Sequence, residues 1–142
     1  MVNHEIFSEN AIKNISSINK HVVEKRPESF GVDDPSLITK IFERVNQYYH
    51  IPNKKVRLIK RASHVLAGII FEQPFKNGNK STAYIVTQHY LKINGLTFSA
   101  NISDDEVIQL LESISPFFLN EDQYDIAFSS AEDFLNNNII LK

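Results

Sequence analysis

The stretch Gln73–Ala83, which reads QPFKNGNKSTA, combines residue types that favour binding of an anion. Pro74 ends one apolar helical pattern, and the turn signal 77–79 leads directly into another. The first N–H groups of a helix lack partners and lie at the positive end of its dipole, so they bind anions. Gly78 allows the backbone to approach a ligand closely. Lys80 places a cation in the first turn of the helix, where the helix dipole disfavours positive charge unless an anion faces it. A phosphate or carboxylate site is therefore predicted, although the same residues are also typical of an ordinary connection between two helices.

Proton transfer at such a site would need a general base, and histidine is the usual one at neutral pH. The chain has five histidines, but none falls inside the stretch. His64 lies nine residues before Gln73, and His89 lies ten residues after Asn79, about 15 Å along a helix. Neither spacing places an imidazole in the loop. Cysteine is absent, which excludes thiolate nucleophiles and zinc–thiolate sites, and the histidines show no metal-ligand spacing.

The elements that would position the loop are helical, because apolar residues recur at helical spacing along nearly the whole chain. Six helices are expected, beginning near residues 8, 35, 60, 79, 103 and 120. The one that begins at Asn79 is apolar nearly all round and is expected to end at Asn94, before Gly95. Residues 51–60 break the pattern and read as a loop or as a short extended segment.

The bulk properties are those of one compact all-α domain over residues 1–142. Hydrophobic residues make up 42% of the 142 residues, and no repeat or linker interrupts them. A net charge of −2 gives no indication of nucleic acid as a partner. The chain has no apolar run long enough to cross a membrane, and its N-terminus is too polar for a signal peptide. We therefore expect a cytoplasmic protein that binds neither nucleic acid nor membrane.

The stretch resembles the signature of the Fic/Doc family in its death-on-curing branch, which reads His-x-Phe-x-Asp/Glu-Gly/Ala-Asn-Lys-Arg-Thr-Ala. Six positions match in register: Phe75, Gly78, Asn79, Lys80, Thr82 and Ala83. The helix that follows and the upstream segment FGVDDPSL are also similar, so the resemblance spans roughly residues 28–98. It implies a compact all-helical fold that binds a nucleotide through residues 77–81. The structural positions of the motif are Pro74, Phe75, Thr82 and Ala83.

The resemblance also implies an activity. Active members transfer phosphate or AMP from ATP or another nucleotide to a hydroxyl of a target protein, with Mg²⁺ as the metal. The lysine at position 80 resembles the signature of the Doc-like branch, in which the terminal phosphate is transferred. A target protein or an antitoxin-like protein is the implied partner. Members hold the target segment with a short extended flap before the motif, and residues 56–60, VRLIK, are the candidate for it.

Three departures from the signature fall on its chemical positions. Gln73 occupies the place of the catalytic histidine, and a glutamine amide cannot accept a proton at neutral pH. Asn77 replaces the carboxylate that holds Mg²⁺ and offers only a weaker, neutral oxygen ligand. Ser81 replaces an arginine that binds phosphate, and it lacks both the charge and the bidentate fork.

Together these departures predict a degenerate active site, inactive or attenuated for transfer, which retains nucleotide binding. Two alternatives stay open. One is an active protein-modifying transferase whose chemistry tolerates Gln73, with the target hydroxyl deprotonated by solvent or by the nucleotide phosphate. The other is a non-catalytic protein-interaction module that kept the fold and lost the nucleotide.

Overall fold

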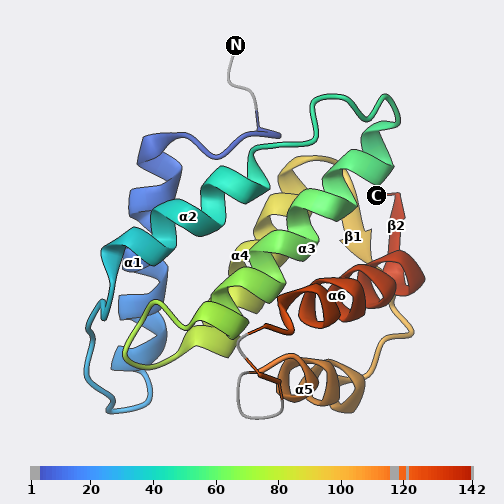
Figure 1. The fold of residues 1–142 in the computed structure, drawn as a ribbon. Helices are drawn as coiled ribbons and strands as arrows, with labels where there is room; N and C mark the ends of the chain where they lie inside the picture. The colour runs from blue at the N-terminus through green and yellow to red at the C-terminus, as the bar shows by residue number, and fades with distance from the viewer. Residues whose placement is uncertain (1–3, 116–118, 121, 142) are drawn as a thin grey trace.

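The computed structural model describes residues 4–115, 119–120 and 122–141, which form six helices and one two-stranded antiparallel sheet (Figure 1). The elements are α1 (Glu9–Glu24), α2 (Pro35–Val45), α3 (Lys54–Glu72), α4 (Asn79–Ile93), β1 (Leu96–Phe98), α5 (Asp104–Ser113), α6 (Tyr124–Asn138) and β2 (Ile139–Leu141). The prediction of an all-α bundle of about six helices is confirmed. In the described part of the chain, no helix is long and apolar enough to span a membrane.

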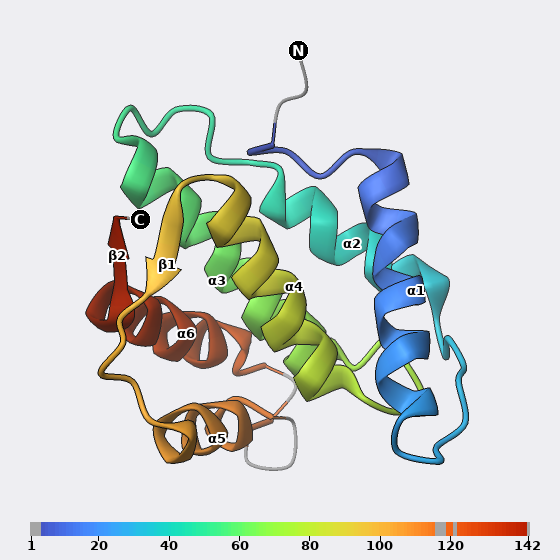
Figure 2. The ribbon, with the colours of Figure 1, turned by 180° about the vertical axis from the view of Figure 1, so that it is seen from behind.

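Helix α3 forms the centre of the bundle. It packs against α4, α2 and α6, and every residue from 61 to 70 is buried. Gly68 allows α2 to come close, because a Cβ at this position would lie 2.8 Å from Cγ2 of Ile41. Figures 1 and 2 show α1 and α2 on one side of the α3–α4 pair and α5 and α6 on the other. Helix α4 is less buried than its sequence indicates, since Ile85 and Ile93 are 41% and 42% exposed.

The beginning of α3 corrects the prediction of a flap at residues 56–60. Asn53 caps the helix by accepting a hydrogen bond from the N–H of Val56 at 3.0 Å, so residues 56–60 are helical. Leu58 and Ile59 are buried in the cluster that also contains Leu91. Burial of these side chains at helical spacing outweighs the local alternation that favoured an extended segment. The irregular connection before α3 is therefore confined to residues 46–53.

The segment before α1 is tied to the bundle by its polar groups. Glu5 Oε1 accepts hydrogen bonds from Arg57 Nε and Nη2 at 2.9 and 2.7 Å and lies 3.6 Å from Nη1 of Arg61. The hydroxyl of Tyr90 donates to the carbonyl of Glu5 at 2.7 Å. Phe7 packs between Phe42 and Tyr90, with ring centroids 4.7 and 5.0 Å away. These contacts fix the start of α1 relative to α3 and α4.

Candidate functional site

The loop between α3 and α4 begins and ends with left-handed backbone. Gln73 follows the last turn of α3 with φ 50° and ψ 60°, and its N–H donates to the carbonyl of Ile69 at 3.0 Å. Gly78 precedes α4 with φ 76°. Between them Phe75 is 1% exposed and anchors the loop in the core, whereas the side chain of Gln73 lies in solvent. The loop is therefore anchored in the core by Phe75, and the side chain of residue 73 points outward into solvent.

Asn79 holds the loop closed. Its Oδ1 accepts from the N–H of Phe75 at 3.0 Å, and its Nδ2 donates to the carbonyl of the same residue at 2.8 Å. The side chain is 8% exposed, so both bonds are shielded from water. Because these side-chain atoms are engaged inside the loop, Asn79 can offer a ligand only its backbone N–H.

Helix α1 forms the floor of the loop through Asn19, which is fully buried. Its Nδ2 donates to the carbonyl of Asn77 at 2.7 Å and to Oγ1 of Thr82 at 3.1 Å. A Cβ at Gly78 would lie 2.9 Å from Cγ1 of Val23 and 3.1 Å from Nδ2 of Asn19. Position 78 therefore requires glycine for both its conformation and its space.

The segment before α2 closes the other side of the loop. The N–H of Asp33 donates to the carbonyl of Pro74, and the N–H of Lys76 donates to the carbonyl of Gly31, both at 2.9 Å. Asn77 Nδ2 donates to the carbonyl of Ser29 at 3.0 Å, which leaves its Oδ1 free of hydrogen bonds within the described residues. The loop is thus held between α1 and residues 29–33 by hydrogen bonds within the chain.

The N-terminus of α4 carries the groups that suit an anion. Gly78 supplies no capping side chain, so the first N–H groups of the helix are free for solvent or a ligand. Lys80 is half-buried and forms no ion pair with the residues that the structure describes. The guanidinium of Arg26, at the end of α1, donates to the hydroxyl of Ser81. The predicted nucleotide-binding positions 77–81 therefore lie together around one helix start.

The residues present do not fit Mg²⁺. Asn77 offers one neutral oxygen, and within the described ranges no group of three acidic or histidine side chains gathers to hold a metal ion. Mg²⁺ in nucleotide sites is usually held through one or two carboxylates.

His64 lies outside the loop, in a buried aromatic cluster. Its Nδ1 is 2.7 Å from the hydroxyl of Tyr124, and its Nε2 contacts the hydroxyl of Tyr48. Burial, together with the charges of Arg44 and Lys60, lowers the pKa of His64 to about 4. A neutral imidazole bound on both nitrogens by tyrosines cannot act as the base at Gln73.

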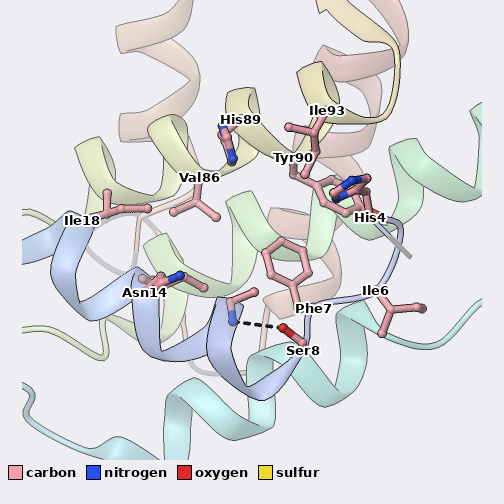
Figure 3. Close-up of a pocket in the computed structure, with 12 residues that line it drawn as sticks. His4, Ile6, Phe7, Ser8, Asn14, Ile18, Val86, His89, Tyr90 and Ile93 are labelled. Carbon is pink, nitrogen blue, oxygen red and sulfur yellow. Dashed lines mark hydrogen bonds between the residues drawn. The ribbon is translucent and has the colours of Figure 1, made fainter. Parts of the chain in front are cut away.

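A cavity of about 640 Å³ lies between α1, α4 and the segment before α1 (Figure 3). Its lining is mostly apolar, with His4 and His89 among the few polar side chains: His4, Ile6, Phe7, Ser8, Ala11, Asn14, Ile15, Ile18, Val86, His89, Tyr90 and Ile93. His89 thus belongs to this cavity and not to the loop. Sequence alone does not indicate this cavity, because its walls come from two stretches that lie far apart in the chain, residues 4–18 and 86–93.

The fold and the loop define the class of the protein: an all-helical bundle in which a tight, internally bonded loop presents a free helix start beside basic side chains. Comparison with protein families gives a match of the Fic/DOC family to residues 7–91. The chain therefore belongs to the Fic/DOC family, which suggests a nucleotide-transferase-like function. A search of the curated proteins gives no match.

Proposed function

We propose that this protein binds the phosphates of a nucleotide at the N-terminus of α4 and is inactive or strongly attenuated in group transfer. One observation carries the proposal. The loop keeps its shape through Asn79 and Asn19, whereas the outward-facing position 73 carries an amide instead of an imidazole.

The phosphate contacts follow from the geometry at the helix start. The backbone N–H groups of residues 79–81 supply donors at the positive end of the α4 dipole. The ammonium group of Lys80, which has no carboxylate partner within the described residues, supplies a charge in the first turn. Bonds from such donors to an anionic oxygen are stronger than bonds between neutral groups.

The attenuation follows from proton transfer. When a target hydroxyl attacks phosphorus, its proton must leave, and a positioned base usually contributes about 10²–10⁴ in rate. Gln73 can accept a hydrogen bond from that hydroxyl and so orient it, but its amide does not take up the proton. In the alternative of an active transferase, the proton passes to solvent or to the nucleotide phosphate.

Calorimetric titration with ATP tests the binding step. We expect Lys80→Ala to weaken ATP binding by about 10- to 100-fold, because it removes one charge-assisted contact. Lys92→Ala is the matched control, since Lys92 is an exposed lysine at the other end of α4 and should leave the affinity unchanged. Equal affinities of native protein and Lys80→Ala would contradict the proposal. Transfer of labelled phosphate to protein by the native chain, lost in Lys80→Ala, would support the active alternative.

The cavity between α1 and α4 favours a second candidate function, that of a protein-interaction module. Its walls are mostly apolar, and Ile93 in its lining is 42% exposed, so an apolar segment of a partner protein could be buried there. This function requires no nucleotide. Absence of ATP binding at millimolar concentration, together with an accessible cavity, would favour it over the first proposal.

Accessibility of this cavity can be measured with the apolar dye anilinonaphthalene sulfonate. We expect the folded protein to enhance the dye fluorescence, and Ile18→Asp to abolish the enhancement by placing a charge in the apolar wall. Ile108→Asp is the control, because Ile108 is 52% exposed on α5 and lies outside the lining. Equal fluorescence of the two variants would show that the dye does not enter the cavity.

A further inference from the structure

The side chain of Arg26 reaches the start of α4 from the end of α1 and has no carboxylate partner among the described residues. It lies just beyond the end of α1, 55 residues from Ser81 in the sequence, and its Nη2 donates to Oγ of Ser81. Among the described residues it forms no ion pair. A guanidinium has five N–H donors, so a single bond to a hydroxyl leaves most of them available.

The surroundings of Arg26 suit an anion. A cavity of about 330 Å³ lies beside it, and its lining contains cationic, hydroxyl and apolar side chains but no carboxylate: His21, Val22, Lys25, Arg26, Ser81, Tyr84, Ile85 and Leu111. Lys25 adds a second cation next to Arg26. The charge of this lining is complementary to a phosphate chain.

Ser81 itself stands where the Fic/Doc signature has its phosphate-binding arginine. We propose that Arg26 supplies from α1 the guanidinium that the motif has lost at position 81, and that it binds the outer phosphates of a nucleoside di- or triphosphate. The inference rests on the proposed nucleotide site at α4. The planar fork of the guanidinium can bind two phosphate oxygens at once, which a serine hydroxyl cannot do.

The position of Arg26 is set by the same helix that forms the floor of the loop. Asn19 and Val23, one to two turns earlier on α1, lie against Asn77 and Gly78. The N–H of Arg26 donates to the carbonyl of Val23 at 3.1 Å, so the backbone at position 26 stays tied to the helix end. The guanidinium therefore approaches α4 from a rigid support.

Titrations with AMP, ADP and ATP test the role of Arg26. We expect Arg26→Ala to weaken ADP and ATP binding by at least about 10-fold while affecting AMP less, and Arg26→Lys to restore only part of the affinity. The double variant Arg26→Ala with Ser81→Arg should recover binding, because it returns a guanidinium to the motif position. Lys13→Ala, an exposed lysine on α1, is the control for a general loss of charge.

The results separate this inference from the proposal on which it rests. If Lys80→Ala weakens ATP binding and Arg26→Ala does not, the role of Arg26 is refuted while the nucleotide site stands. If Arg26→Ala weakens all three nucleotides equally, or if Ser81→Arg gives no rescue, Arg26 does not bind the outer phosphates. If the native protein binds none of the nucleotides, both proposals fail. Thermal unfolding of each variant checks that the exposed substitution leaves the fold intact.

Discussion

Replacement Gln73→His is expected to increase the transfer rate by about 10²–10⁴-fold, with water or a protein hydroxyl as the acceptor. The substitution places a titratable base at the outward-facing position of the loop. The backbone already suits it, because residue 73 has φ 50° and ψ 60°, and histidine is found in this left-handed region several-fold more often than most residues. The fold should therefore tolerate the change without loss of stability.

Release of phosphate or pyrophosphate from ATP measures this gain without a known target protein. The rate of Gln73→His should rise with pH as the new imidazole loses its proton, near its ordinary pKa of about 6.5, whereas the native rate should lack this rise. Gln73→Asn is the control, because asparagine also tolerates left-handed backbone but does not titrate. A native protein as fast as Gln73→His would show that chemistry here does not depend on a base at position 73.

Acid is expected to destabilise the protein through His64, by up to roughly 3 kcal/mol. Burial is the first cause of its lowered pKa, and the positive charges of Arg44 and Lys60 add to it, giving a value of about 4 in the folded state. In the unfolded chain the pKa returns to about 6.5, so the unfolded state binds the proton more readily. The contribution of His64 to stability is therefore complete above about pH 6.5 and is lost as the pH falls towards 4.

Chemical denaturation between pH 7.5 and pH 4.5 measures this loss. His64→Gln should flatten the pH dependence, because it removes the titrating group while keeping polar atoms for Tyr48 and Tyr124. His50→Gln is the control, since His50 is an exposed histidine in the connection before α3. An unchanged slope in His64→Gln would show that His64 is not the source of the acid sensitivity.

Local chemistry in the sequence was sufficient to predict most helix starts. Ser8 accepts from the N–H of Ala11, and Ser103 accepts from the N–H of Glu106, as their spacing indicates. These caps act within three residues, so a single sequence contains them completely. The start of α3 was missed because the burial of Leu58 and Ile59 depends on partners elsewhere in the chain, which a local alternation of residues does not reveal.

The candidate site likewise contains parts that the local sequence predicts and parts that depend on distant residues. The loop and its glycine were predicted from adjacent residues, whereas Asn19 and Arg26 contact the loop and α4 from 55 to 63 residues away. One signal could have found Asn19: it is a polar residue in line with the buried positions Ile15 and Val22 of α1. An amide in such a stripe needs a buried partner. Arg26 shows no comparable signal, because an exposed arginine at the end of a helix is common.

The internal bonding of Asn79 affects what a sequence signature can report. Its side chain joins two backbone groups of Phe75, and Gly78 fits only because it has no Cβ beside Val23 and Asn19. Loss of either residue is therefore expected to disturb the packing of the loop. The side chain of residue 73 lies in solvent and makes no such contact, so among residues that tolerate left-handed backbone its type can change without disturbing the loop. A match to this signature therefore indicates the fold. The reaction depends on the exposed residues of the loop, such as residue 73.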